Sequence, residues 1–186
     1  RRVLLPSAAD RWGMAEGLAR HGADLTIADF AFLLGLPLRF RDLDRFERAV
    51  RLVAPVVARL PVAWIYPTGG EQDRAVTGWR AAWFDEAEAI AGDFHLIARY
   101  APRDLRGKVV LTNTTTAENL TDLGARGVAL VATTTPRSGG RSLPTNLLEA
   151  AFVAVSGRFP LPDADLAAMV DEAGLAPDVW RPPRRP

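Results

Sequence analysis

Short apolar runs that suit β-strands alternate along this chain with stretches of helical periodicity, and this alternation limits the fold more than any other feature. The strand candidates are residues 3–6, 24–29, 62–66, 89–93, 108–113 and 128–133. Strands that are separated by helices form mostly parallel sheets covered on both faces. About six strands are expected for two mononucleotide-binding halves. The sequence therefore predicts an α/β, three-layer Rossmann-like fold with a mostly parallel sheet and helices on both faces.

The helices of the first half can be placed from their ends and their apolar spacing. Asp10 can N-cap a helix that ends near Gly22, a residue suited to a left-handed C-terminal conformation. Further along, apolar residues recur at helical spacing, and Pro55 lies inside this pattern, so we expect a kink there or a break into two pieces. This predicted buried stripe consists of Phe46, Val50, Val53, Val57 and Leu60.

The last third of the chain carries two further helices. Residues 146–156 are apolar almost all round, which predicts a helix deep against the sheet that ends at Gly157. Residues 163–173 predict a final amphipathic helix. We therefore divide the chain into a Rossmann-like nucleotide-binding domain at 1–160 and a C-terminal helix with a Pro/Arg-rich tail at 161–186. Because the chain starts at Arg1 and enters a strand by Val3, we expect an N-terminal substrate domain to be missing.

The composition limits the binding partners and the cellular location that we expect for this protein. The 186 residues carry a formal net charge of +1, which gives no reason to expect nucleic acid or an anionic membrane. There is no cysteine, and no apolar run approaches the roughly 18 residues of a membrane helix. Two histidines without cysteine argue against a catalytic metal site. We expect a cytoplasmic protein that binds a small-molecule ligand, with a homodimer as a possible assembly.

The turn after the first strand resembles a degenerate phosphate-binding loop. Ser7, Ala9 and Gly13 stand where a G-x-G-x-x-x-G variant has its three glycines. Small residues let the backbone approach a phosphate, and Ser7 adds a hydroxyl donor. Asp10 argues the other way, because a carboxylate at that helix end would compete with a diphosphate for the N–H groups. The turn can therefore bind a diphosphate or merely be a turn that requires small residues.

Asp29 closes the second strand about 20 residues after this turn, where an acid binds the ribose hydroxyls of NAD. It can equally be the N-cap of a short helix at 31–34. Arg39 and Arg41 follow, and they would favour NADP if the loop folds back. The cofactor is thus predicted as NAD or NADP, with the choice left open.

Several other loops are expected at the same edge of the sheet, because ligands bind at the carboxyl ends of parallel strands. Their hydroxyl, amide and glycine groups suit a sugar, a phosphate or a nicotinamide amide, although threonine also favours strands and Thr116 can cap a helix. His95 follows a strand end and is a weak candidate for an acid or base. Arg137 and Arg141 flank paired glycines in an anion-binding lid or an exposed loop. The candidate cofactor contacts in these loops are Thr68, Gly69, Asn113, Thr114, Thr115, Thr134 and Thr135.

Seven segments together resemble a bacterial family of quinate/shikimate 5-dehydrogenase-like proteins, over nearly all of the chain up to about Gly157. They read SAADRWGMAEGLA, LGLPL, YPTGGEQ, AGDFHLI, DLRGKVVLTNTTT, GVALVATTTP and GRSLPTNLLEA. The resemblance implies a C-terminal NAD(P)-binding domain whose partner domain binds a hydroxylated cyclohexane acid and supplies a Lys–Asp pair. The glycine-rich turn of shikimate dehydrogenases is not matched. Lys108, the only lysine, precedes a strand at the opposite edge, so we predict that it is not catalytic.

Three functions follow from these observations. The first is an NAD(P)-binding domain of a two-domain oxidoreductase that acts on a small hydroxylated acid such as quinate or shikimate, with the fragment alone inactive. The second is a ligand-sensing or regulatory Rossmann-like domain that has lost dinucleotide binding, as Asp10 and the absent glycines suggest. The third is a transferase or ligase half-domain that uses the Thr and Arg loops for phosphate.

Overall fold

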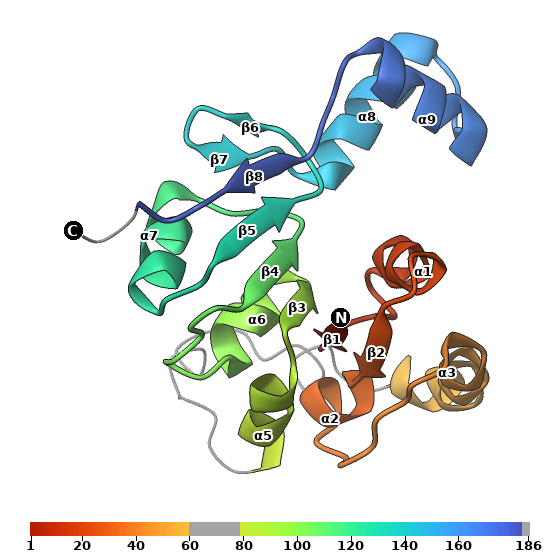
Figure 1. The fold of residues 1–186 in the computed structure, drawn as a ribbon. Helices are drawn as coiled ribbons and strands as arrows, with labels where there is room; N and C mark the ends of the chain where they lie inside the picture. Colours follow the sequence, from red (N-terminus) through yellow and green to blue (C-terminus); the bar gives the residue numbers. More distant parts are fainter. Residues whose placement is uncertain (60–78, 184–186) are drawn as a thin grey trace.

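A six-stranded sheet forms the centre of the protein in the computed structural model, which describes residues 1–59 and 79–183 (Figure 1). The strand order is β2-β1-β3-β4-β5-β8. The first five strands in this order are parallel, and β8 pairs with β5 in the antiparallel sense. The strands are β1 (Arg2–Leu5), β2 (Asp24–Ile27), β3 (Ala89–Gly92), β4 (Val109–Thr112), β5 (Leu130–Thr133) and β8 (Asp178–Trp180). The predicted α/β, mostly parallel Rossmann-like architecture is confirmed.

Five of the six predicted strands are present, each with bounds within about two residues of the prediction. The candidate at 62–66 lies outside the described residues. The sixth strand of the sheet is β8, which was not predicted. It has only three residues in a proline-rich segment, and it forms because Val131 and Ala132 of β5 offer an edge to pair with. The C-terminal tail therefore contributes a strand to the same sheet.

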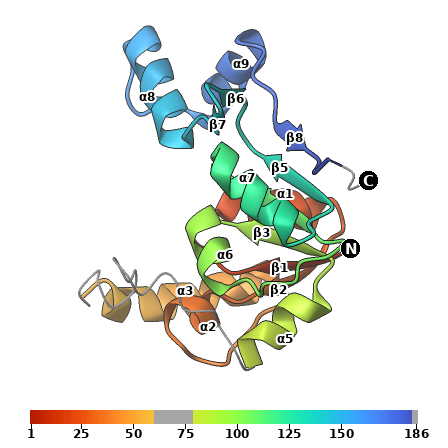
Figure 2. The ribbon, with the colours of Figure 1, turned by 90° about the vertical axis from the view of Figure 1, so that its left-hand side faces the viewer.

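Helices cover the sheet on both faces, because successive strand residues point to opposite sides. Figure 2 shows α5, α6 and α7 on one face and α1 behind the sheet. The side chains confirm this arrangement: α5, α6 and α7 contribute to the core cluster that holds Leu4 and Ile90, whereas α1 and α3 pack on the cluster that holds Leu5. The helices are α1 (Trp12–Arg20), α2 (Asp29–Leu33), α3 (Leu43–Val57), α5 (Trp79–Glu86), α6 (Phe94–Tyr100), α7 (Ala117–Ala125), α8 (Thr145–Ser156) and α9 (Asp163–Glu172).

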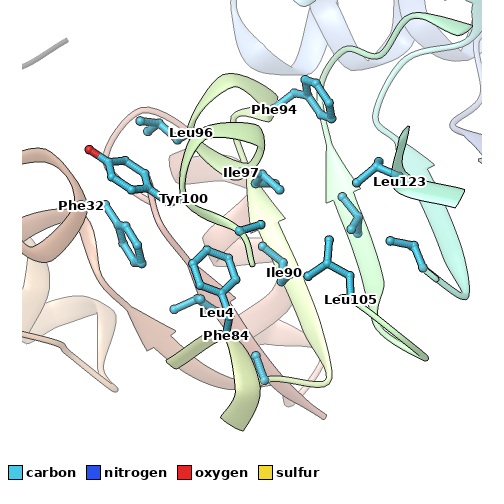
Figure 3. Close-up of a cluster of buried hydrophobic side chains, with 14 of the residues drawn as sticks. Leu4, Phe32, Phe84, Ile90, Phe94, Leu96, Ile97, Tyr100, Leu105 and Leu123 are labelled. Atoms are coloured by element: carbon cyan, nitrogen blue, oxygen red, sulfur yellow. The ribbon is translucent and has the colours of Figure 1, made fainter. Parts of the chain in front are cut away.

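The two cores are rich in aromatic rings. In the first, Phe32 contacts both Phe84 of α5 and Tyr100 of α6, at ring separations of 5.6 and 5.0 Å (Figure 3). In the second, Phe46 of α3 is fully buried and contacts Phe30, Phe40 and Trp12 at ring separations of 5.5–6.3 Å. Burial of one such side chain contributes about 1.5–3 kcal/mol, so these rings hold α3 and α6 against the sheet.

The predicted position of one helix is wrong. The helix predicted to lie deep against the sheet is α8, which instead packs with α9 and projects away from the sheet (Figures 1 and 2). It has no buried residue, and Val155 is 82% exposed. A helix that is apolar all round has no single buried face, so its sequence does not say which surface it contacts. Gly157 ends it in a left-handed conformation, as predicted.

A kink or a break into two pieces was predicted at Pro55, and the break is not found, because α3 is one helix from Leu43 to Val57. Pro55 lies in its last turn, where the loss of one backbone hydrogen bond does not divide the helix. Among the helices of the described part of the chain, none is long and apolar enough to cross a membrane.

Candidate functional site

The direction of the chain reverses between β1 and β3, and this creates a switch point at the carboxyl edge of the sheet. From β1 the chain moves outward to β2 and then crosses back to β3. Ligands of open α/β sheets bind at such a point. Here the turn after β1 meets the turn after β3: the Asp93 N–H donates to the Ser7 hydroxyl at 3.1 Å. A Cβ on Gly92, whose φ is +151°, would lie 3.0 Å from that hydroxyl oxygen. Glycine is therefore required for the two turns to touch.

The N–H groups of the β1–α1 turn are bonded to a carboxylate of the protein itself. The two carboxylate oxygens of Asp29 accept hydrogen bonds from the N–H groups of Ala8 and Ala9, at 2.9 and 2.8 Å. Asp29 is 4% exposed, and this burial raises its pKa to about 6, against the lowering effect of the two N–H donors. An internal anion therefore occupies donors that the sequence assigned to a diphosphate.

Asp10 is not the N-cap of α1, so that prediction is wrong. The cap residue is Arg11, without a side-chain capping bond, and Asp10 is an exposed residue whose carboxylate lies 3.5 Å from the Arg11 Nε. The predicted competition with a phosphate exists, but its source is Asp29. Nor is Asp29 an N-cap, because α2 begins at Asp29 after Ala28, and its carboxylate points back to the β1 turn. Gly13 is exposed, and a Cβ there would have no neighbour within 4 Å.

A polar cluster that was not predicted connects the ends of β1, β3 and β4. The Asp93 carboxylate accepts from Arg11 Nη2 at 3.1 Å and from Asn113 Nδ2 at 3.4 Å. Its other oxygen accepts from the His95 N–H at 2.9 Å and so caps α6. Asp93 is 7% exposed, and Arg11 provides its compensating charge. The helix-capping position of Asp93 in AGDFH was the one available sequence signal.

An apolar pocket lies next to Asp29, between α2 and α3. It is a cavity of about 140 Å³, and its lining is apolar except for Asp29. The residues of α3 that line it belong to the stripe predicted as core, but Val50, Val53 and Val57 are only half-buried. The lining residues are Ala9, Asp29, Phe30, Leu33, Leu34, Val50, Val53, Ala54 and Val57. The acid at the tip of β2 thus borders a pocket that sequence periodicity alone did not reveal.

A second, polar pocket of about 100 Å³ lies at the ends of β3 and β4. It brings His95, Thr114 and Thr115 together, as expected for loops at one edge of the sheet. Thr116 also caps α7, as predicted: its Oγ1 accepts from the Asn119 N–H at 3.2 Å, and the Asn119 Oδ1 accepts from the Thr116 N–H at 2.9 Å. The lining residues are Phe94, His95, Thr114, Thr115, Thr116, Asn119, Arg141 and Ser142.

Other candidate contacts do not line this pocket. Thr134 is exposed, and Thr135 is buried with its hydroxyl donating to the Asn113 carbonyl at 3.3 Å. Thr135 and Asn113 therefore brace the strand ends. Thr68 and Gly69 lie outside the residues that the structure describes.

Three other basic residues, Arg39, Arg41 and Lys108, line neither of these two pockets. Arg39 pairs with Glu86 at 2.9 Å, and Arg41 with Asp24 at 2.8 Å. Lys108 precedes β4 at the amino edge, where its Nζ donates to the Ala87 carbonyl at 2.7 Å. Within residues 1–59 and 79–183, no group of three or more His, Asp or Glu side chains has the arrangement of a metal site.

Comparison with known proteins gives a family and a distant likeness of fold. Residues 1–182 match the model of the family described as "Domain of unknown function (DUF8754)". No curated protein matches the sequence. One similar solved structure is a reductive aminase from Aspergillus terreus in complex with NADPH4, cyclohexanone and allyl amine, at 15% identity and a TM-score of 0.33. The match covers 74% of this chain and 42% of the aminase chain, so this chain spans less than half the aminase's length.

Proposed function

The chain belongs to the DUF8754 family, and we propose that it is the NAD(P)-binding domain of a two-domain oxidoreductase that acts on a small hydroxylated acid such as quinate or shikimate. In this proposal, the other domain supplies the acid–base groups and binds the reacting part of the substrate. NAD(P), when bound, would supply the hydride acceptor or donor, and this domain would orient it.

The observation that carries the proposal is the apolar pocket beside Asp29. Its side walls are apolar residues of α2 and α3, and one border is a carboxylate at the tip of β2. A flat aromatic base with an attached ribose requires this combination: an apolar slot next to an acceptor for the ribose hydroxyls. Ala9, from the β1–α1 turn, also lines the pocket, so the turn that would hold a diphosphate borders it.

The polar pocket supports the same proposal from the other side of the switch point. It lies at the ends of β3 and β4, whereas the apolar pocket lies beyond β2, and the β1–α1 turn is between them. An extended ligand with an adenosine at one end and a nicotinamide that ends beside the polar pocket at the other matches this order. Ser7, Ala9 and Gly13 would hold the diphosphate, while His95, Thr114 and Thr115 would face the nicotinamide end.

The turn can accept a diphosphate only if Asp29 releases the N–H groups of Ala8 and Ala9. A ribose offers the Asp29 carboxylate two hydroxyl donors in exchange for these two N–H donors. Binding therefore replaces one set of hydrogen bonds to Asp29 with another, and the buried carboxylate is not left unpaired.

Calorimetric titration of the whole chain with NAD⁺ and NADP⁺, each separately at modest ionic strength, tests this proposal. An Ala54→Trp variant fills the apolar pocket, and Leu52→Trp on the same helix is the matched control, because Leu52 is 79% exposed and does not line the pocket. We expect saturable binding that Ala54→Trp weakens at least about tenfold, or about 1.4 kcal/mol, while Leu52→Trp leaves it unchanged. Absence of binding, or binding whose affinity Ala54→Trp leaves unchanged, contradicts the proposal.

The second candidate is a ligand-sensing or regulatory domain that has lost dinucleotide binding. It is favoured by the hydrogen bonds that the Asp29 carboxylate accepts from the N–H groups of the turn. An Asp29→Ser variant distinguishes the two candidate functions, because the serine side chain is too short to accept hydrogen bonds from both N–H groups of the turn. The second candidate predicts that the wild-type chain binds neither nucleotide and that Asp29→Ser gains binding. The first predicts that the wild-type chain binds and that Asp29→Ser shifts its preference toward NADP⁺, since the acid that repels the 2′-phosphate is gone.

A further inference from the structure

The two arginines of the loop after β5 have different environments. Arg137 is half-buried: its Nε lies 3.3 Å from the Asp178 carboxylate, and its Nη2 donates to the Thr115 hydroxyl at 3.2 Å. Arg141 is exposed and lines the polar pocket. Among residues 1–59 and 79–183, no side chain forms an ion pair or hydrogen bond with the Arg141 guanidinium. Of these two arginines, Arg141 is therefore the one whose charge is not compensated within the described part of the chain.

The backbone around Arg141 is held in place on the pocket rim. Gly139 and Gly140, with φ of +57° and +82°, form a two-residue turn that joins β6 (Arg137–Ser138) to β7 (Arg141–Ser142). Positive φ at both positions is the requirement of a tight hairpin turn, which glycine meets without strain. The Ser142 N–H donates to the Thr115 carbonyl at 2.9 Å, and the backbones of Arg141 and Thr116 form an isolated antiparallel β-bridge. The hairpin is thus docked on the end of β4.

The pocket contains donors and no acid. Its lining includes the guanidinium of Arg141, the imidazole of His95 and the hydroxyl of Thr114. The side chains of Thr116 and Asn119 are already used in the capping box of α7. Glu118 is exposed in the first turn of α7 and does not line the pocket. This environment favours an anion with oxygen acceptors.

The size of the pocket limits what part of a ligand it can hold. Its volume of about 100 Å³ is well below the roughly 300–1,000 Å³ of pockets that enclose a whole small molecule. It can hold one functional group and the carbon atoms next to it.

We propose that this pocket binds the carboxylate of a small hydroxy acid, with Arg141 as the cation that pairs with it and Thr114 as a hydroxyl donor. The assignment of that acid as the substrate rests on the proposed function, whereas binding of the carboxylate does not. Arg141 holds the end of the acid that is not oxidised, so it determines specificity and is not a catalytic residue.

The test is a two-dimensional ¹H–¹⁵N NMR titration of the whole chain with glycolate, and with glycolamide as a neutral probe of the same shape. Both run at constant ionic strength, because added salt screens the charge pair. We expect saturable shifts at Thr114, Thr116 and Arg141 with glycolate and none with glycolamide. Arg141→Gln should weaken glycolate binding at least about tenfold, because a charge-assisted hydrogen bond is lost. Arg20→Gln, which removes an exposed charge from the end of α1, should leave it unchanged.

Three results would overturn the inference. The first is the absence of saturable shifts with glycolate, and the second is glycolate binding that Arg141→Gln leaves unchanged. The third is binding of glycolamide as tight as that of glycolate, which would make the pocket a carboxamide site. Because glycolate is titrated without nucleotide, failure to bind NAD(P) and failure to bind the carboxylate are separate results.

Discussion

Asp29 is a carboxylic acid buried at the tip of β2, and it makes the stability of the fold depend on pH in a direction opposite to that of most carboxylates. Burial raises its pKa from 3.8 to about 6. The folded state therefore holds the proton more tightly than the unfolded state does. The stabilisation that comes from this protonated acid is fully present below about pH 3.8 and is lost as pH rises through 6.

The size of this effect follows from the shift. A difference of one pKa unit corresponds to about 1.4 kcal/mol, so the shift of Asp29 is worth about 3 kcal/mol over its full range. Most of this, about 2–3 kcal/mol, falls between pH 4 and 7. In an Asp29→Asn variant, the residue does not titrate. The free energy of unfolding of the wild type relative to that of Asp29→Asn should therefore fall by this amount as pH rises across the interval.

Urea unfolding followed by tryptophan fluorescence, at a series of pH values between about 4.5 and 7.5, measures this difference. Taking the difference between wild type and variant cancels the titration of all other groups that the substitution leaves alone. Asp10→Asn is the matched control, since it removes one negative charge from an exposed position in the same turn. A constant separation between the wild-type and Asp29→Asn curves would refute the reasoning, because it would mean that the buried acid does not change its protonation in this range.

Two further substitutions test the packing that positions the site. Gly92→Ala should lower the free energy of unfolding by about 1–3 kcal/mol, because Gly92 has a φ of +151° and its new Cβ would press on the Ser7 hydroxyl. Chemical denaturation measures this loss, with Gly13→Ala as the control, because a Cβ at Gly13 has open space. Equal effects at the two glycines would contradict the prediction. Phe46→Ala should lower the free energy of unfolding by about 3–5 kcal/mol, because the ring is fully buried in the aromatic cluster under α3. Thermal unfolding checks this, with Leu52→Ala on the same helix as the control. A loss below about 1 kcal/mol would show that α3 does not depend on the ring.

The strands could be predicted from the sequence because each carries its own signal. Residues such as Val3, Leu4 and Leu5 are apolar and buried, and β1 needs no information from distant parts of the chain to be recognised. The carboxyl ends of parallel strands meet at one edge, so the grouping of His95 with Thr114 and Thr115 could also be predicted. The position of β8 could not, because three residues become a strand only where a neighbouring edge is free.

The candidate site shows where prediction from sequence stops. Small residues at Ser7 and Ala9 indicated a turn that can approach a phosphate, and Asp29 was placed at the tip of its strand. The carboxylate predicted to compete for the N–H groups of this turn was the wrong one, because Asp10 is nearer in sequence while Asp29 is nearer in space. The pairing of Arg11 with Asp93, 82 residues apart, has no local sequence signal at all.

The sequence by itself thus determined five parallel strands, the helices between them and the edge of the sheet at which a ligand would bind. These features depend on local periodicity and on the general geometry of α/β folds. Only the tertiary structure decided that the Asp29 carboxylate accepts hydrogen bonds from the turn and that half-buried residues of α3 form a pocket beside it. It also decided that Arg137 pairs with Asp178, whereas Arg141 has no such partner among the residues that the structure describes. These features depend on which side chains come together from distant segments. Hydrogen bonding and burial act over a few ångströms in space, irrespective of separation along the chain.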